Sequence, residues 1–232
     1  MQPVLVVCAH GTRDPTGRAT VADTVRAVAA RLPGVEVREA YVDVHGPEVD
    51  TVVAGLPRFE EGLAGVVVPL LLAAGYHVRV DLAAAVRDRQ DVVVTPALGP
   101  DDRLVDVVRD RLGPEVGPSD QVVLAPAGSS DERSQEDSRE TGRRLEQRLR
   151  VPVRVAYAAG ARPPVACGVT AARIDGAQRV VVASYLLAPG FFQRRLEGSG
   201  ADAVSAPLLP DERVVALVVE RYRSALGGAS AG

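Results

Sequence analysis

Short apolar runs alternate with amphipathic stretches along the whole chain. Runs rich in valine, such as Val4–Cys8 and Gly65–Leu72, are typical of strands that are buried on both faces of a parallel sheet. The stretches between them repeat apolar residues every three or four positions, as at Val21, Val25 and Val28, which is the spacing of a helix with one buried face. This alternation predicts βαβ units and a parallel sheet.

The same pattern predicts where each element lies. Strands are expected at Val4–Cys8, Val35–Ala40, Gly65–Leu72, Asp91–Thr95, Gln121–Ala125, Pro152–Tyr157, Arg179–Ser184 and Ala201–Val204. Helices are expected at Gly17–Arg31, Pro47–Phe59, Val78–Arg89, Asp102–Leu112, Asp131–Leu149, Pro163–Ile174, Gly190–Glu197 and Pro210–Leu226. Every predicted helix follows a predicted strand, as in an α/β fold.

The second part of the chain repeats the first. Val4–Asp14 aligns with Val122–Asp131, and Val68–His77 aligns with Ala183–Phe192, in the same order and at a shift of 115 to 117 residues. A segment rich in glycine and proline, Gly113–Asp120, separates the copies. The repeat predicts two parallel-sheet α/β domains related by pseudo-two-fold symmetry, residues 1–115 and 116–232.

The two copies differ at three positions that could bind a metal. His10, Asp43 and His77 of the first copy align with Ala127, Ala159 and Phe192 of the second. Residues needed for the scaffold are kept, such as Gly11, which aligns with Gly128. The loss of all three polar groups together favours a functional site in the first domain over three separate structural roles.

The predicted topology brings these three residues to one edge. His10, Asp43 and His77 each follow a strand, and parallel sheets place ligand sites at the carboxyl ends of their strands. Two imidazoles and a carboxylate suit a divalent ion such as Fe²⁺ or Co²⁺, and neutral imidazole can also accept a proton. The alternative for a single histidine is a structural or surface role, and a surface role is the one expected for His45.

Several other residues are candidates for binding an acidic substrate. Glycine turns between a strand and a helix expose backbone N–H groups to an anion. The candidate substrate-binding residues are Gly11, Arg13, Gly75, Ser129, Ser130, Phe191, Phe192 and Arg194. For the polar members, the alternative is a solvated helix face. Nucleotide-binding glycine motifs and the GxSxG motif of serine hydrolases are absent from the sequence.

Composition narrows the possible functions. The formal net charge of −3 predicts no binding to nucleic acid. The two cysteines argue against a disulfide scaffold or a cysteine-built metal site, and they fit a cytoplasmic protein. The longest apolar run is shorter than the ~18 residues of a membrane helix, so no membrane association is expected.

The segments around the candidate ligands carry a family resemblance. AHGTRDPTG, AYVDVHGPEV and VPLLLAAGYHVRVDL resemble the sirohydrochlorin chelatases, the CbiX-type class II chelatases, and VVVASYLLAPGFFQRRL resembles the second copy of their two-domain members. The resemblance implies two flavodoxin-like domains that face each other across a cleft, where the tetrapyrrole binds. It places the two family histidines at His10 and His77, and it places Asp43 where the family often has Glu.

The resemblance also implies an activity. We expect a lyase that inserts Fe²⁺ for sirohaem, or Co²⁺ for cobalamin, into sirohydrochlorin, with the metal as substrate and no organic cofactor. Because the duplication would supply internally the dimer of single-domain members, a monomer is expected. Two alternatives remain open, a metal or tetrapyrrole carrier without turnover and an unrelated α/β enzyme that binds a small anion.

Overall fold

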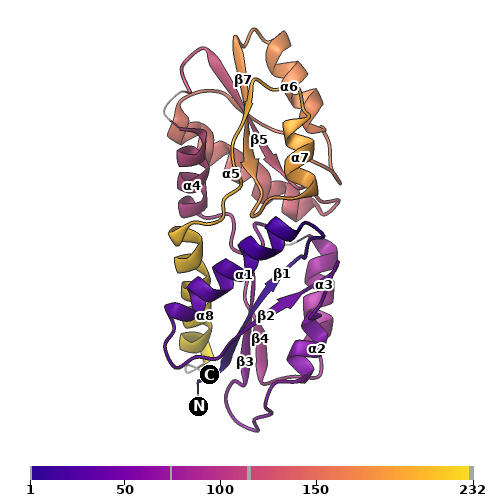
Figure 1. Ribbon diagram of the computed structural model, residues 1–232, viewed down its shortest axis with the longest axis vertical. Helices are drawn as coiled ribbons and strands as arrows, with labels where there is room; N and C mark the ends of the chain where they lie inside the picture. The colour runs from indigo at the N-terminus through magenta and orange to yellow at the C-terminus, as the bar shows by residue number, and fades with distance from the viewer. Residues whose placement is uncertain (1, 74, 114–115, 230–232) are drawn as a thin grey trace. The chain divides into compact units, whose positions relative to one another are not determined.

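The computed structural model describes residues 2–73, 75–113 and 116–229, without the side chains of residues 76–79, 228 and 229 (Figure 1). It contains two four-stranded sheets, and every neighbouring pair of strands is parallel. The first sheet has the order β2-β1-β3-β4 and the second has the order β6-β5-β7-β8. These orders match the first four strands of a flavodoxin-like sheet. The predicted α/β class with two parallel sheets is therefore confirmed.

The strands coincide with the predicted apolar runs to within a few residues. Their bounds are β1 (Val4–Ala9), β2 (Val37–Tyr41), β3 (Gly65–Pro69), β4 (Val92–Val94), β5 (Asp120–Pro126), β6 (Val153–Val155), β7 (Arg179–Tyr185) and β8 (Ala203–Val204). All six residues of β1 are buried, because helices cover both faces of the sheet. This is why the strands read as continuous apolar runs rather than as alternating patterns.

The helices also lie where the periodicity places them. Their bounds are α1 (Pro15–Ala30), α2 (Val49–Ala54), α3 (Tyr76–Ala85), α4 (Asp102–Leu112), α5 (Glu132–Leu149), α6 (Val165–Ile174), α7 (Phe191–Glu197) and α8 (Glu212–Ala229). The helix α2 is shorter than predicted: it ends at a cap on Gly55, and Pro57 two residues later cannot continue a helix. No helix in the described part of the chain combines the length and apolar character needed to cross a membrane.

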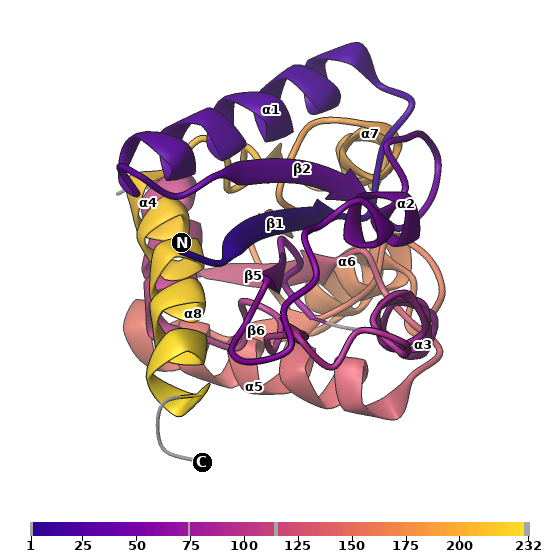
Figure 2. The same ribbon diagram turned by 90° about the horizontal axis from the view of Figure 1, so that it is seen from below.

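Each sheet lies between two pairs of helices. In the first sheet, α1 and α8 pack together on one face, and α2 and α3 pack on the other (Figures 1 and 2). In the second sheet, α5 and α4 form one layer, and α6 and α7 form the other. Because α1 corresponds to α5, and α2 and α3 correspond to α6 and α7, the two sheets are covered in the same way.

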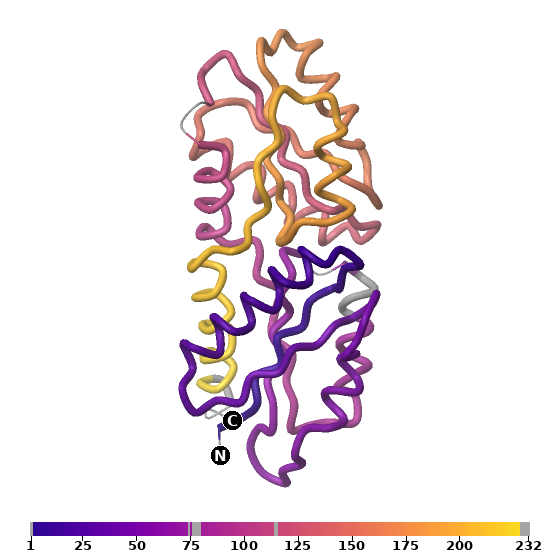
Figure 3. The backbone as a smooth tube through the Cα atoms, in the orientation of Figure 1, coloured from indigo at the N-terminus to yellow at the C-terminus, as the bar shows by residue number. Residues whose placement is uncertain are grey.

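The last helix of each copy covers the sheet of the other copy. The chain divides into a first unit, Met1–Leu98 with Glu212–Gly232, and a second unit, Gly99–Asp211. The helix α4 packs on α5 and β7, whereas α8 lies beside α1 and β3, as the chain trace shows (Figure 3). The compact units thus differ from the predicted domains 1–115 and 116–232. The repeat identifies equivalent helices, but the apolar stripe of α4 can cover either sheet, and the sequence does not say which.

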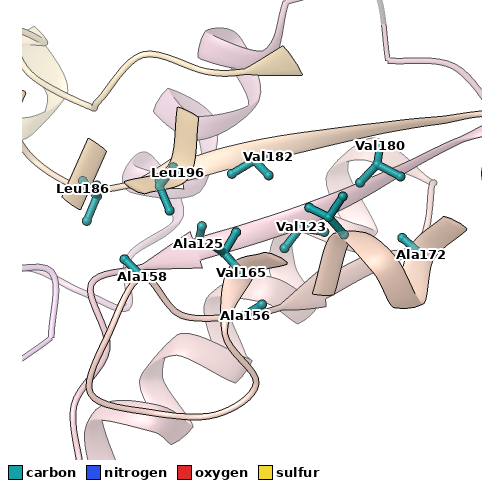
Figure 4. Packing of buried hydrophobic residues seen from close by; sticks show 11 residues of the cluster. Val123, Ala125, Ala156, Ala158, Val165, Ala172, Val180, Val182, Leu186 and Leu196 are labelled. Carbon is teal, nitrogen blue, oxygen red and sulfur yellow. The ribbon is translucent and has the colours of Figure 1, made fainter. Parts of the chain in front are cut away.

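Small aliphatic side chains fill the cores. Under α6 and α7 the cluster is built from β5, β7 and the helices, and it includes Val123, Ala125, Val165, Val182 and Leu196 (Figure 4). The equivalent cluster under α2 and α3 is built from the strands β1 to β4 together with α2 and α3, and most of its buried residues are valines. Close packing of these short side chains gives each sheet a rigid carboxyl edge.

A buried ion pair holds the loop that follows α2. Arg89 and Asp91 are almost fully buried, and the Arg89 guanidinium donates both to Asp91 and to the carbonyls of Val53, Leu56 and Pro57. The hydrogen bonds from Arg89 hold the pKa of Asp91 at about 2, against the opposing effect of burial. This pair holds the connection between α2 and β3 in place. It lies at the end of the sheet opposite to the candidate ligands.

Candidate metal site at the carboxyl edge of the first sheet

The three candidate ligands follow the first three strands of the first sheet, which are neighbours in it. His10 comes directly after β1, Asp43 comes two residues after β2, and His77 is the second residue of α3, which follows β3. All three strands are parallel, so these positions share one edge. The strand order reverses between β1 and β3, because β2 lies on one side of β1 and β3 and β4 lie on the other, and such a switch point is where open α/β sheets bind their ligands.

Backbone hydrogen bonds join the loops that carry His10 and Asp43. The N–H of Val42 donates to the Ala9 carbonyl at 3.0 Å, and the N–H of Asp43 donates to the His10 carbonyl at 3.1 Å. The strand ladder therefore continues beyond the sheet. It brings the backbones of His10 and Asp43 next to each other, as the sequence predicts.

Gly11 makes this approach possible. Its φ is +102°, and a Cβ at this residue would lie 2.1 Å from the Asp43 carbonyl oxygen. Any other residue would therefore push the two loops apart. The structure gives Gly11 this backbone role, and its predicted contact with substrate stays a prediction.

The second sheet repeats this frame without the ligands. The N–H of Ala159 donates to the Ala127 carbonyl at 2.8 Å, and a Cβ on Gly128 would lie 1.8 Å from the Ala159 oxygen. The backbone frame thus forms equally well with alanine at the positions of His10 and Asp43. The polar side chains of the first edge are not required to build its loops.

The Asp43 carboxylate is tied to a strained turn. Its Oδ1 accepts the N–H of Val44 at 2.6 Å, and Val44 has a φ of +74°. A left-handed conformation costs a non-glycine residue about 1–2 kcal/mol, and a β-branched residue rarely adopts it. In the second copy the same position is Gly160, with a φ of +65°. The strain is therefore specific to the edge that carries Asp43.

His45, for which the sequence favours a surface role, is half-buried and not fully exposed. Its ring centroid lies 3.9 Å from that of Tyr41, and its Nδ1 lies 3.0 Å from the Gly46 carbonyl. Its Nε2 is buried and has no hydrogen-bond partner among the described residues. The repeat alignment could have singled out His45 as well, because the second copy has Ala161 at the equivalent position.

The neighbours of His45 are specific to the first copy as well. The Tyr41 hydroxyl donates to Glu39, and burial, followed by this hydrogen bond, raises the pKa of Tyr41. The second copy keeps the tyrosine as Tyr157 but has Val155 in place of Glu39. The first edge therefore carries a polar cluster beyond the three residues that sequence reasoning selected.

The remaining side chains at this edge differ in accessibility. The His10 side chain is exposed, as a ligand for an incoming ion must be. Cys8 is buried, and desolvation raises the pKa of its thiol to about 12, so it is a core residue and not a thiolate ligand. The side chain of His77 lies outside the described residues. Among the side chains that are described, no three potential ligands form a cluster.

The polar residues predicted to bind substrate are partly used in local structure. The Ser129 hydroxyl accepts the N–H of Asp131 at 3.1 Å, which leaves its own O–H free to donate. Ser130, Arg13 and Arg194 have exposed side chains. Gly75 is the N-cap residue of α3. Their contact with a substrate remains a prediction.

The two adjacent phenylalanines of the second unit have different environments. Phe191 is 59% exposed, and Phe192 packs against the core cluster beside Ala127. Their rings meet edge to face with centroids 5.5 Å apart, and the Arg195 guanidinium lies 5.8 Å from the Phe191 ring centroid. Phe191 is therefore the ring available to a ligand, whereas Phe192 fills the position that corresponds to His77.

A buried polar network that the sequence did not predict holds α7. The Ser184 hydroxyl donates to Gln193 Oε1 at 2.7 Å, and Gln193 Nε2 donates to the Ser205 carbonyl at 3.1 Å. All three residues are buried. They fix α7, and with it Phe191, to the carboxyl ends of β7 and β8.

Comparisons with known proteins agree with this architecture. Residues 4–115 and 121–225 each match the family model CbiX. The fold is similar to that of SirB from Bacillus subtilis with Fe3+, at a TM-score of 0.76 and 18% identity over 99% of this chain and 98% of that one. SirB from Bacillus subtilis subspecies spizizenii in complex with cobalt gives a TM-score of 0.75 and 18% identity over 98% and 97%.

A third solved structure has the same fold. It is described as CbiX, the terminal enzyme for biosynthesis of siroheme in denitrifying bacteria, and it gives a TM-score of 0.70 and 18% identity over 96% of this chain and 99% of that one. No curated protein matches the chain. The two matches to the family model bear out the predicted resemblance and its two-copy form.

Proposed function

Because the chain belongs to the CbiX family, we propose that it is a sirohydrochlorin chelatase that inserts a divalent metal at the carboxyl edge of its first sheet. The observation that carries this proposal is the contrast between the two edges. The same backbone frame holds an imidazole and a carboxylate in one copy and two alanines in the other. We assign the chemistry to the copy that keeps the polar groups.

Metal insertion makes three demands on the protein. The hydrated ion must exchange water for protein ligands, the macrocycle must present nitrogen lone pairs, and two pyrrole N–H protons must leave as the ion enters. In the proposal, His10 and His77 bind the incoming ion and accept these protons, since neutral imidazole can do both. Few and exchangeable ligands are an advantage, because the ion must be passed on.

Asp43 is proposed to supply negative charge or to orient an imidazole. Its Oδ1 is engaged by the Val44 N–H, and the side chain is exposed at the loop that touches His10. A carboxylate at this position favours a divalent cation electrostatically. As an aspartate it is one methylene shorter than the glutamate that the family often carries. Because its reach is shorter, we assign to it negative charge and orientation of an imidazole in addition to direct contact with the metal ion.

The second copy is proposed to bind the macrocycle and its carboxylates. Phe191 offers an exposed aromatic face, and Ser129, Ser130 and Arg194 offer hydrogen-bond donors for carboxylates. On the first copy, Arg13 and the backbone around Gly11 and Gly75 are proposed to do the same. These groups suit a flat ring with several acidic side chains.

The metal is proposed to be Fe²⁺ for sirohaem or Co²⁺ for cobalamin. Imidazole and carboxylate ligands accommodate both ions, and geometry or supply selects between them. The test is an anaerobic assay of the purified chain with sirohydrochlorin and Fe²⁺, Co²⁺ or Ni²⁺. The absorption of the macrocycle is recorded over time. Insertion shifts this absorption, and the rate of the shift should be proportional to the enzyme concentration. A rate that does not exceed the protein-free reaction for any ion would refute the proposal and favour a carrier without turnover.

A further inference from the structure

The turn that carries Asp43 contains an imidazole with no assigned role. His45 Nε2 is buried and has no hydrogen-bond partner among the described residues. Burying a polar atom without a partner costs free energy, and a native structure rarely keeps such an atom without a reason. The cost is avoidable at this position, because the second copy has Ala161 there.

The hydrogen bond at the other nitrogen sets the tautomer. His45 Nδ1 lies 3.0 Å from the Gly46 carbonyl oxygen, which can only accept. The proton of a neutral ring therefore sits on Nδ1, and Nε2 presents its lone pair. An Nδ1–H bonded to a backbone carbonyl with a bare Nε2 is the arrangement of many histidines that bind metals.

The backbone joins His45 to Asp43 in one turn. The N–H of His45 donates to the Asp43 carbonyl at 2.9 Å, so that the two residues close one tight turn around Val44. Both groups are engaged in the present conformation, Asp43 by the Val44 N–H and the His45 ring by Tyr41. The left-handed Val44 makes this conformation costly.

We propose that His45 is an additional metal ligand of the first copy, which binds the incoming divalent ion through Nε2 together with the Asp43 carboxylate. The inference rests on the proposed function and extends it to the step before insertion. Opening of the strained turn releases both groups at once, and the relief of strain at Val44 offsets part of the cost of opening. The second copy has no strained residue and no ligand in this turn, with Gly160 and Ala161 in place of Val44 and His45.

The test measures binding of Co²⁺ alone to the full chain, without tetrapyrrole, by calorimetry and by the ligand-field absorption of the bound ion. His45→Ala copies the residue of the second copy, and His45→Phe keeps an aromatic ring against Tyr41 but has no lone pair. Both variants should bind Co²⁺ at least ~10-fold more weakly and lose absorption intensity. Glu48→Gln, which changes an exposed carboxylate of the same loop, should bind as the wild type does.

The outcomes separate this inference from the proposed function. Wild-type affinity in His45→Phe would overturn the inference and leave His45 a packing role against Tyr41. Absence of Co²⁺ binding to the wild type would overturn it as well. Co²⁺ binding that depends on His45, in a protein that fails to metallate sirohydrochlorin, would support the inference and refute the proposed function. Since Ala161 occupies the same turn in the second copy, both variants are expected to fold.

Discussion

The carboxyl edges of the two sheets have the same backbone and different chemistry. The pairs His10 with Asp43 and Ala127 with Ala159 are joined by equivalent N–H···O bonds, at 3.1 and 2.8 Å. Both frames need a glycine with positive φ, Gly11 or Gly128. The comparison separates what builds the loops from what the loops carry. Glycines and the strand ladder build them, and the polar side chains of the first copy are not needed for this frame.

A second contrast lies at the opposite ends of the same sheets. In the first unit, Asp91 pairs with a buried arginine, Arg89, whose side chain is 3% exposed. In the second unit, Asp202 pairs with Arg173, whose side chain is 42% exposed. An aspartate directly before the fourth strand is thus part of the core in one unit and part of the surface in the other.

The largest effects are expected at the candidate ligands. His10→Ala or His77→Ala should lower the rate of metal insertion ~10²- to 10⁴-fold, because each removes a metal ligand and a proton acceptor together. Folding should persist, since the second copy folds with Ala127 and Phe192 at these positions. The insertion assay measures the rate, and circular dichroism checks folding.

The control for this prediction uses the duplicate frame. Ala127→His in the His10→Ala protein should not restore insertion, because that edge lacks an acidic residue at Ala159 and a histidine at Phe192. Restored activity would show that the two edges are equivalent. Wild-type activity in the double variant His10→Ala, His77→Ala would refute the assignment of the site.

The buried ion pair should dominate the stability of the first unit. Arg89→Ala should lower the free energy of unfolding by about 3–5 kcal/mol, because it leaves the buried Asp91 carboxylate without its guanidinium partner. Arg173→Ala, which breaks the exposed ion pair with Asp202 in the second unit, should cost about 0–1 kcal/mol. Urea unfolding of both variants provides the measurement. Equal costs would mean that burial does not distinguish the two pairs.

Substrate affinity should depend on Phe191. Phe191→Ala should weaken tetrapyrrole binding by about 1–3 kcal/mol through lost apolar contact, with little change in stability, because this ring is exposed. Phe192→Ala should lower both affinity and stability, because Phe192 packs against the core cluster. Fluorescence or absorption titration with the macrocycle measures the first effect and thermal unfolding measures the second. An unchanged affinity in Phe191→Ala would exclude this ring from the binding surface.

Exchanging the residues of the two turns should shift stability in opposite directions. Val44→Gly should stabilise the protein by up to ~1 kcal/mol, because glycine adopts a positive φ without strain. Gly160→Val should destabilise it by at least ~1–2 kcal/mol. A Cβ there would also lie 3.3 Å from the carbonyl group of Gly128. If both changes shift the unfolding free energy in the same direction, the turns are not equivalent.

The same buried ion pair should make the stability of the first unit depend on pH in the acidic range. Its folded pKa of about 2 is below the ordinary value, so its contribution to stability is complete above about pH 4 and is lost as the pH falls towards 2. Asp91→Asn should therefore flatten the loss of stability in this acidic range. Unfolding measured by urea at pH 5, 4 and 3 tests the slope. An unchanged slope would place the acid sensitivity at other carboxylates.

Much of the fold and of the site was predictable because it depends on local patterns. Runs such as Val4–Cys8 are typical of strands buried on both faces, and the glycine turn predicted at Gly11 lies between β1 and α1 in the structure. The repeat alignment selected His10 and Asp43 as candidates, because the loss of a polar residue from one copy is visible in the sequence alone. The same alignment contains His45 opposite Ala161, but a loop histidine without coordinates is most simply taken as exposed.

The sequence by itself determined the elements, their parallel arrangement and the asymmetry of the two copies, because periodicity, glycine positions and residue identity are local properties. Only the tertiary structure decided that α4 covers the second sheet and α8 the first, since an apolar stripe does not specify its partner. It also decided that His45 Nε2 is buried without a partner and that Val44 is left-handed. These features arise where the loops that follow β1 and β2 contact each other. Contacts between segments that are distant in the chain produce no periodic pattern in the sequence.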